Sequence, residues 1–243
     1  MKIHIAIIFI ACSCFSVCHA QPTAGSKMKS ADTVYTRGKA SADGTGKFYL
    51  GREIAGVMGA EGSEWLERNE RQQEENTALA IEKINLSPNS IVADIGAGTG
   101  YYSFRLSSKV PQGKVYAVDI QDELLRYLTN KKSLLKDSVV EIIKGSAYSP
   151  NLPDNSIDLV IMVDVYHELA FPHEMLQSIS KALKPHGKIL LIEYRGEDPA
   201  VPIKVLHKTT VVQLNRELNT NGFKLHSRQE FLPIQHFLLY EKK

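Results

Sequence analysis

Cysteine is nearly absent from this sequence. Its 243 residues contain three cysteines, Cys12, Cys14 and Cys18, so a chain cut after Ala20 would contain none. This excludes disulfides, thiolate zinc sites and a cysteine nucleophile from the rest of the chain. It also removes the usual sign of an oxidising compartment.

The sequence also lacks a strong charge of either sign. Its 29 Lys and Arg residues against 27 Asp and Glu residues give a formal net charge of +2, without a block of like charges. A nucleic-acid partner is therefore not expected, nor is membrane contact beyond the N-terminal segment. With 43% hydrophobic and 23% charged residues, the composition is typical of one globular domain, and it leaves the oligomeric state open.

The apolar stretch near the start is too short to span a membrane. It runs from Ile3 to about Val17, whereas a membrane-spanning helix needs about 20 residues. With Lys2 before it and Ala20 after it, the stretch predicts a signal peptide over residues 1–20 and export to the periplasm. A membrane anchor, lipid modification at Cys12 and cytoplasmic retention stay open.

Residues 21–47 are rich in small and polar side chains and predict a flexible linker. From Phe48 the composition changes, and residues 48–86 carry Trp65 and several leucines and isoleucines among Glu, Arg and Gln. This pattern predicts one or two helices, which end before Ser87-Pro88-Asn89. The globular domain is expected to span residues 48–243.

After this break, short apolar segments alternate with amphipathic ones. Buried strands separated by amphipathic helices predict a Rossmann-like, doubly wound α/β fold, with helices on both faces of a mostly parallel sheet. The expected strands are 90–96, 114–120, 139–145, 157–165 and 188–195.

The last part of the chain departs from this alternation. Residues 201–222 predict a helix that ends at Asn221-Gly222. Two strands follow, 223–232 and 236–243, joined by only three residues. So short a link requires an antiparallel hairpin, which we expect at one edge of a seven-stranded sheet.

A glycine-rich turn follows the first strand of the alternation. Asp94 precedes Gly96, Gly98 and Gly100, and glycines at these positions let a ligand approach the backbone closely. The spacing fits neither the dinucleotide nor the triphosphate loop template. Asp94 would repel pyrophosphate but attract an amino group, which favours a nucleoside joined to an amino acid.

The second strand ends in Asp119, where a carboxylate can bind both ribose hydroxyls. With "VADIGAGTG", "VYAVDI", "DLVIMVDVYHEL" and "LKPHGKILLIEYR" in this order, residues 85–243 resemble the class I S-adenosylmethionine-dependent methyltransferases. Through "GREIAGVMG", "WLERNER", "VPIKVLHK" and "LPIQHF" the chain is also similar to a bacterial group with exported or lipoprotein-like starts.

The resemblance implies S-adenosylmethionine as the cofactor. The glycine-rich turn would hold its methionine part, Asp119 its ribose and Ile120 its adenine. Ser146 and Ala147 stand where many members have an acidic residue that binds the adenine amino group. For Asp94 a helix cap, and for Asp119 a turn, are the structural alternatives. The implied cofactor-binding residues are Asp94, Gly96, Ala97, Gly98, Gly100, Tyr101, Asp119, Ile120, Ser146, Ala147 and Asp164.

The fourth strand ends in the ionisable cluster "DVYHE". Ligands of open parallel sheets bind at the carboxyl ends of strands, so this cluster would face the methyl group and the acceptor. His167 is the candidate base, with Glu168 or Asp164 fixing its tautomer, and Tyr166 would contact the acceptor. Alternatively, His167 only caps a helix or braces the loop.

Two further histidines, His207 and His236, are candidates for the same site. With His167, Glu168 and Glu193 they could in principle bind a metal, but without a close His-x-x-x-His pair we assign no metal site. Trp65, Arg68 and Arg71 are expected on a helical lid over the cofactor, or on a solvated helix face.

These features predict a methyltransferase that acts on a small molecule. An oxygen or carbon acceptor is favoured over a metalloid, because metalloid methylation in related enzymes relies on cysteines. A catalytically inactive S-adenosylmethionine-binding module is the main alternative, and an NAD-type oxidoreductase fits the glycine spacing poorly. Export would separate the chain from a cytosolic cofactor, a conflict that the sequence leaves unresolved.

Overall fold

The computed structural model describes residues 34–243. The predicted signal peptide over residues 1–20, the lipidation alternative at Cys12 and residues 21–33 of the predicted linker lie outside the described residues. Among the helices of residues 34–243, none has the length and apolar character needed to cross a membrane.

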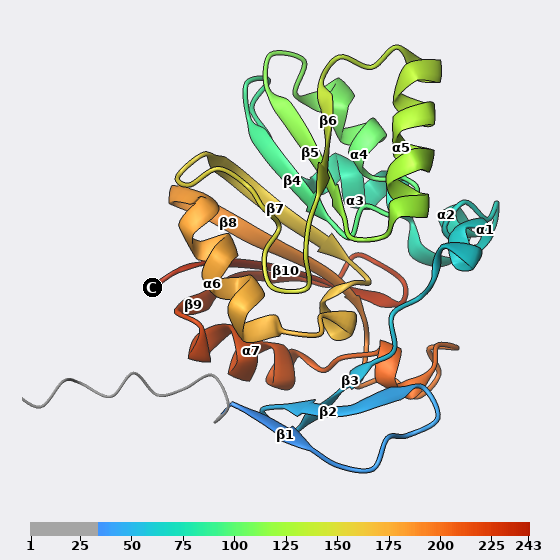
Figure 1. Ribbon diagram of the computed structural model, residues 1–243, viewed down its shortest axis with the longest axis vertical. Helices are drawn as coiled ribbons and strands as arrows, with labels where there is room; N and C mark the ends of the chain where they lie inside the picture. The colour runs from blue at the N-terminus through green and yellow to red at the C-terminus, as the bar shows by residue number, and fades with distance from the viewer. Residues whose placement is uncertain (1–33) are drawn as a thin grey trace, which may run out of the picture. The chain divides into compact units, whose positions relative to one another are not determined.

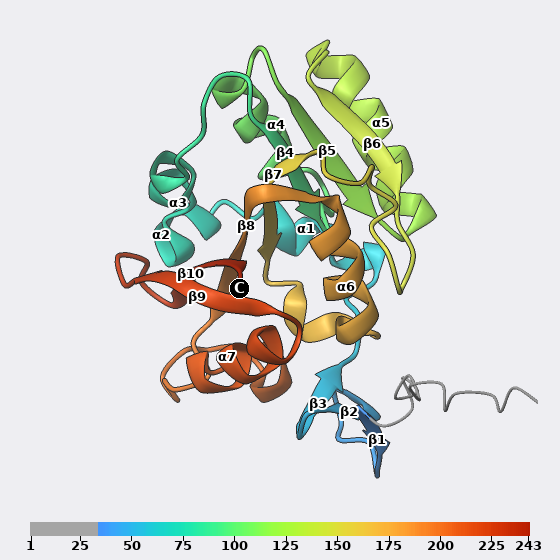
Figure 2. The same ribbon diagram turned by 90° about the vertical axis from the view of Figure 1, so that its left-hand side faces the viewer.

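A seven-stranded sheet forms the centre of the domain, as Figures 1 and 2 show. Its strand order is β6-β5-β4-β7-β8-β10-β9. Strand β10 runs antiparallel to both of its neighbours, β8 and β9, and the other neighbouring strands are parallel. This confirms the mostly parallel sheet with a C-terminal hairpin. The strands are β4 Ile91–Ile95, β5 Lys114–Asp119, β6 Val140–Lys144, β7 Ile157–Val163, β8 Leu183–Tyr194, β9 Phe223–Gln229 and β10 Gln235–Lys242.

Helices cover both faces of this sheet because alternate strand residues point to opposite sides. One apolar cluster includes Leu106 and Leu128, and the other includes Leu176 and Leu214; all four are fully buried. The first face carries α3 Thr77–Lys83, α4 Ser103–Leu106, the 3-10 turn η3 Ser107–Lys109 and α5 Asp122–Leu135, and the second carries α6 Pro172–Ala182 and α7 Val211–Thr220.

The helix expected over residues 201–222 is shorter than predicted. Only Val211–Thr220 is α-helical; a single 3-10 turn, η5 Val205–His207, lies before it. Thr210 caps the helix, because its hydroxyl accepts a hydrogen bond from the Gln213 N–H. Gly222 follows the helix with φ +84°, as expected for its C-terminal cap. Residues 201–210 are therefore mostly a loop.

The predicted linker is wrong for its last part. Three strands, β1 Tyr35–Arg37, β2 Gly44–Tyr49 and β3 Arg52–Ala55, form a small antiparallel sheet at the N-terminal end of the described chain. Residues 48–59, where helix was expected, likewise form strand, turn and loop. A two-residue turn at Leu50 and Gly51, both with positive φ, joins β2 to β3.

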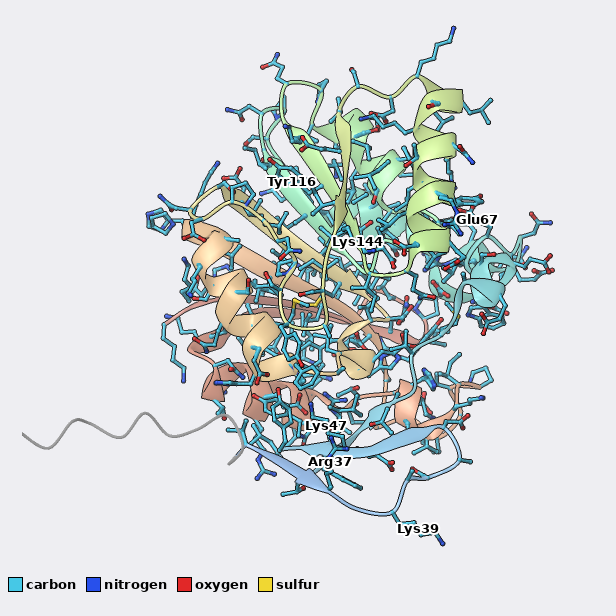
Figure 3. All side chains as sticks on the ribbon, viewed as in Figure 1. Arg37, Lys39, Lys47, Glu67, Tyr116 and Lys144 are labelled. Atoms are coloured by element: carbon cyan, nitrogen blue, oxygen red, sulfur yellow. The ribbon has the colours of Figure 1, made fainter. Side chains whose placement is uncertain are left out.

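This small sheet is ordered by its contacts with the rest of the domain, which local composition does not reveal. Buried Tyr49 accepts a hydrogen bond from the side-chain N–H of Asn221 beyond α7. Lys47, labelled in Figure 3, donates to the Ala170 carbonyl oxygen over 2.6 Å and lies over the Phe171 ring.

The region expected to form a helical lid is helical only from residue 60. It consists of the short pieces η2 Ala60–Gly62, α1 Ser63–Leu66 and α2 Arg71–Glu75, followed by α3. Glu67, labelled in Figure 3, follows α1 and pairs with Lys131 of α5 over 2.8 Å. This ion pair ties the short helices to the main domain.

Candidate active site

A cavity of about 810 Å³ opens at the carboxyl ends of β4, β5 and β7. Its volume is in the range of small-molecule and cofactor sites. The N-terminal sheet, the short helices α1 and α2, and the loop that carries η5 complete its wall. Three parts of the chain that are far apart in sequence therefore meet around one space.

Asp119 and Ile120 line one end of the cavity. The Asp119 carboxylate is held in place, since it accepts hydrogen bonds from the Gly98 N–H at 2.9 Å and from the Ile120 N–H at 2.7 Å. Ile120 is 45% exposed at the end of β5 and offers an apolar surface for a flat ring. Both predicted residues thus lie where a nucleoside can bind.

Ser146 and Ala147 lie at the same end and line the cavity. The Ser146 hydroxyl is engaged in its own turn: it donates to the Ser149 carbonyl oxygen at 3.2 Å and accepts from the Ser149 N–H at 3.1 Å. A hydroxyl used in this way shapes the turn. The contact with adenine, if it comes from this segment, is therefore left to backbone groups.

The glycine-rich turn lies beneath the cavity. Gly96 and Gly98 line it with φ +71° and +55°, and a Cβ atom on Gly96 would come within 2.6 Å of the Val165 side chain. Only glycine fits this position without displacing the neighbouring loop. Ala97 and Gly100 belong to the same turn, but their atoms do not line the cavity.

Asp94 and Tyr101 do not reach the cavity, in contrast to the prediction. Asp94 is buried beneath the turn and accepts a 2.6 Å hydrogen bond from the Ser103 hydroxyl at the start of α4. Burial raises its pKa to about 6. Tyr101 turns away, with its hydroxyl 2.9 Å from that of Thr77. Asp94 therefore supports the turn from beneath; the residue at the cap position of α4 is Tyr102.

Asp164 is the acidic residue that lines the cavity beside the turn. It is held in the left-handed region with φ +54°, and burial raises the pKa of its carboxyl well above the usual range. Oδ2 accepts a 2.7 Å hydrogen bond from Gln235, but buried Oδ1 has no partner within residues 34–243. A buried, unpaired carboxylate oxygen is costly unless a ligand pairs with it.

Arg71 of α2 is a site residue that sequence reasoning placed only on a helical lid. It lines the cavity near Asp164 and is nearly buried. Its Nε donates to Glu75 at 2.8 Å and its Nη1 to the Leu66 carbonyl oxygen at 2.8 Å. Nη2 makes no hydrogen bond within the described part of the chain, so it can bind an anionic group.

His167 and Glu193 form a buried pair at the other end of the cavity. The His167 Nδ1 atom lies 2.6 Å from the Glu193 Oε2 atom, and Glu193 Oε1 also accepts the Tyr166 N–H at 2.8 Å. A carboxylate at this distance accepts a hydrogen bond from Nδ1–H, so the lone pair of a neutral ring is on Nε2. Neither Glu168 nor Asp164, the predicted partners, makes this contact.

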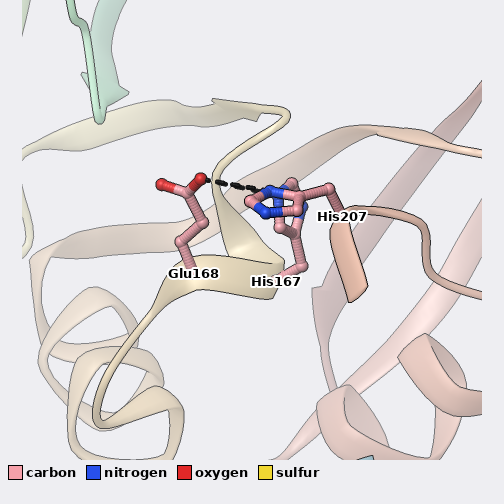
Figure 4. A group of neighbouring side chains, drawn as sticks. All are labelled: His167, Glu168 and His207. Carbon is pink, nitrogen blue, oxygen red and sulfur yellow. Dashed lines mark hydrogen bonds and ion pairs between the residues drawn. The ribbon is translucent and has the colours of Figure 1, made fainter. Parts of the chain in front are cut away.

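Glu168 and His207 stand next to this ring, as Figure 4 shows. His207 comes from η5, 40 residues along the chain, and its Nδ1 lies 3.2 Å from Nε2 of His167. His236, the other histidine considered, lies elsewhere and pairs with Glu197 at 2.9 Å. The structure thus brings together two of the histidines that the sequence keeps apart.

Tyr166, predicted to contact the acceptor, does not line the cavity. Its ring is fully buried in the core behind the site, and its hydroxyl donates to Glu217 of α7 at 2.9 Å. The reason is the 3-10 turn η4 Tyr166–Glu168, in which successive side chains point in different directions. His167 and Glu168 therefore face the cavity, and Tyr166 faces the core.

Comparisons with known proteins agree with this geometry. The profile of a family described as a methyltransferase domain matches residues 86–236. The chain belongs to this family. The resemblance to S-adenosylmethionine-dependent methyltransferases is thereby confirmed, whereas the exported or lipoprotein-like subgroup stays a prediction.

A structure of an S-adenosylmethionine-dependent methyltransferase from Aquifex aeolicus has the same fold. It is 24% identical, with a TM-score of 0.71, over 76% of this chain and 98% of that one. Phosphoethanolamine N-methyltransferase 1 of Arabidopsis thaliana is 26% identical over 65% of this chain and 30% of its own length.

The ubiquinone/menaquinone biosynthesis C-methyltransferase of Ectopseudomonas mendocina is 30% identical over 48% of this chain and 46% of its own length. The match thus spans less than half of either curated relative. The names of these two relatives give nitrogen and carbon as the methylated atom, so the family leaves the acceptor of this chain open.

S-adenosylmethionine is the cofactor that this family implies, and the cavity suits it. The amino group of the cofactor needs a hydrogen-bond acceptor, and buried Oδ1 of Asp164 has no partner within residues 34–243. Arg71 has a free donor for a carboxylate, and Asp119 offers an acceptor beside apolar Ile120. The residues present therefore fit the group.

Proposed function

We propose that the chain transfers a methyl group from S-adenosylmethionine to an oxygen or carbon atom of a small molecule. When bound, this cofactor supplies a methyl group made electrophilic by a positively charged sulfur. The protein's part is to hold the cofactor, align the acceptor about 3 Å from the methyl carbon and help the acceptor lose a proton.

The observation that carries this proposal is the Oδ1 atom of buried Asp164, which has no hydrogen-bond partner in the described part of the chain. In this assignment the Asp164 carboxylate binds the amino group of the methionine part, and Arg71 binds its carboxylate. Asp119 accepts hydrogen bonds from the ribose, and Ile120 packs against the adenine. The glycine spacing of the turn does not fit the dinucleotide template, which disfavours the oxidoreductase.

His167 and Glu168 are the proposed catalytic residues at the acceptor end. Both line the cavity, and the Glu193 carboxylate holds the His167 ring with Nε2 directed toward His207 and Glu168. Met58 and Ile203 supply apolar surface nearby. This combination favours a small, partly apolar acceptor with an acidic O–H or C–H over a metalloid, for which residues 34–243 offer no cysteine.

Titration calorimetry tests cofactor binding. We expect saturable binding of S-adenosylmethionine and none of NAD, and we expect Asp164→Asn to weaken the first by at least about tenfold, because a charged hydrogen bond contributes about 1.5–3 kcal/mol. Asp154→Asn, outside the cavity, is the matched control. Binding of NAD alone would contradict the proposal.

Methyl transfer separates an enzyme from an inactive binding module. Protein incubated with methyl-labelled S-adenosylmethionine and a panel of small phenols, quinols and carboxylic acids should label at least one of them. Labelling should fall with His167→Ala, while cofactor affinity stays unchanged. Binding of S-adenosylmethionine without labelling of any compound in the panel would support the inactive binding module.

A further inference from the structure

The side chains of His167, Glu168 and His207 point toward one another at the acceptor end of the cavity, as Figure 4 shows. The Nε2 atom of His167 lies 3.2 Å from the Nδ1 atom of His207. The Glu168 Oε1 atom lies 3.4 Å from His207 Nδ1 and 3.8 Å from His167 Nε2. Three potential metal ligands therefore form a compact triangle.

The dimensions of this triangle match one face of a zinc tetrahedron. Zinc binds imidazole nitrogen and carboxylate oxygen at about 2.0–2.1 Å, which places neighbouring ligand atoms about 3.3 Å apart. The three separations here, 3.2, 3.4 and 3.8 Å, bracket this value. Two histidines and one glutamate are also the ligand set of known catalytic zinc sites, in which the fourth position stays open.

The surroundings of the triangle hold the ligand atoms in place. Buried Glu193 accepts a hydrogen bond from the Nδ1–H of His167, which directs the Nε2 lone pair toward the triangle. A carboxylate behind a ligating histidine is the usual second-sphere partner in metal sites. The Glu168 carboxylate is oriented in turn, since both of its oxygens accept the Met58 N–H at 3.3 Å.

We propose that His167, Glu168 and His207 bind a divalent zinc-type ion whose open fourth position faces the acceptor. The ion would polarise an oxygen atom of the acceptor, which loses its proton to solvent. The deprotonated oxygen then attacks the methyl carbon of S-adenosylmethionine as the carbon–sulfur bond breaks, and S-adenosylhomocysteine leaves with the bonding electron pair. The role in proton loss assigned above to His167 and Glu168 is thus exerted through the metal. This substrate class, an oxygen-donor ligand, rests on the proposed function; the metal site does not.

The competing arrangement is a simple hydrogen bond. A proton on Nδ1 of His207 donated to Nε2 of His167 would satisfy the two rings without any ion, with Glu168 as a neighbouring acceptor. The two arrangements differ in a measurable way, because only the metal site binds one equivalent of zinc and loses that affinity with any one of its three ligands.

Metal binding is tested on the full chain with Cys12, Cys14 and Cys18 replaced by serine, which removes the thiolates as competing ligands. Protein stripped with EDTA is titrated calorimetrically with zinc chloride. We expect one equivalent to bind, with affinity reduced about 100-fold or more in His207→Ala and in Glu168→Gln, beyond the about 10–100-fold effect of second-sphere changes.

His226→Ala is the matched control, because this histidine is 44% exposed and pairs with Glu241 away from the cavity. It should bind zinc like the parent. Circular dichroism and S-adenosylmethionine affinity should be unchanged in all three variants, which shows that the variants fold. If the parent binds zinc no more tightly than His207→Ala and Glu168→Gln do, the metal site is refuted.

Replacing zinc by cobalt tests whether the fourth ligand position is open. Cobalt-loaded protein should show the intense visible bands of a tetrahedral site, and acetohydroxamate, an oxygen-donor probe, should shift them. Visible bands that do not shift when acetohydroxamate is added would refute an open fourth position. Zinc binding without S-adenosylmethionine binding would instead refute the proposed function and leave the metal site intact, so the two failures are distinguishable.

Discussion

The Nδ1 atom of His167 and the Oε2 atom of Glu193 lie 2.6 Å apart, although 26 residues separate them in the sequence. His167 follows β7 and Glu193 lies near the end of β8, and these neighbouring parallel strands bring the two side chains together. The pair is buried, with side-chain exposures of 2% and 0%. Glu193 thereby sets the tautomer of the ring that faces the cavity.

Replacing the second-sphere carboxylate should weaken the metal site without removing a ligand. In Glu193→Gln the amide oxygen can still accept the Tyr166 N–H, but the negative charge behind His167 is lost. We expect zinc affinity to fall about 10–100-fold, measured by calorimetry. Glu197→Gln, which alters the carboxylate paired with His236, is the control and should bind zinc like the parent.

Asp119 should be required for cofactor affinity. Asp119→Asn keeps an oxygen for the Gly98 N–H but loses the charge that strengthens hydrogen bonds to the ribose. A loss of about 1.5–3 kcal/mol corresponds to an about 10- to 100-fold higher dissociation constant, measured by titration with S-adenosylmethionine. Asp122→Asn, an exposed neighbour, should bind normally. Equal affinities for the two variants would remove Asp119 from the site.

The buried carboxyl of Asp94 should make stability depend on pH. Its folded-state pKa of about 6 is above the ordinary 3.8 because burial disfavours the charge; Asp119 raises this pKa further, and Ser103 and Arg71 oppose the shift. Because the folded-state pKa of Asp94 is raised, its carboxyl stabilises the folded protein most below pH 3.8. This stabilisation is lost as the pH rises through 6. Two pKa units correspond to about 3 kcal/mol.

The measurement is urea unfolding of the parent and of Asp94→Asn between pH 4.5 and 7.5. As the pH rises, the free energy of unfolding of the parent should fall by about 2 kcal/mol relative to that of the variant. This is less than the full effect of about 3 kcal/mol, because part of the titration lies below pH 4.5. Ser103→Ala should steepen this dependence, since the Ser103 hydroxyl favours the ionised form. A difference that is constant with pH would mean that Asp94 is not desolvated.

The N-terminal sheet should be part of the cooperative fold. Arg52 of β3 forms a bidentate, buried ion pair with Glu217 of α7 at 2.7 and 2.9 Å. Arg52→Ala would leave the buried charge of Glu217 without its counter-ion, at a cost of about 3–5 kcal/mol in the free energy of unfolding. Arg37→Ala, on the exposed end of β1, should change it by less than about 0.5 kcal/mol. Chemical denaturation measures both.

The central sheet could be predicted because its strands are covered on both faces. Such strands read as continuous apolar runs, and β7 Ile157–Val163 is the clearest example. The small N-terminal sheet could not be predicted in this way. Its strands are short, and they are stabilised by contacts of Tyr49 with Asn221 and of Arg52 with Glu217, more than 160 residues along the chain.

The residues of the candidate site also differ in how far the sequence could predict them. Asp119, Ile120 and Asp164 could be located from the sequence, because residues at the carboxyl ends of parallel strands meet at one edge of the sheet. Whether each side chain faces the cavity could not. Asp94 turns beneath the glycine-rich loop and Tyr166 into the core, since local backbone conformation decides the direction of each.

The sequence by itself determined the layered fold, the cofactor edge of the sheet and the family, because these follow from local periodicity and short motifs. Only the tertiary structure decided that His207 joins His167 and Glu168, that Glu193 orients the His167 ring and that Arg71 lines the same cavity as Asp164. The physical reason is that these contacts join segments with no local pattern in common, and the packing of loops around the sheet brings them together.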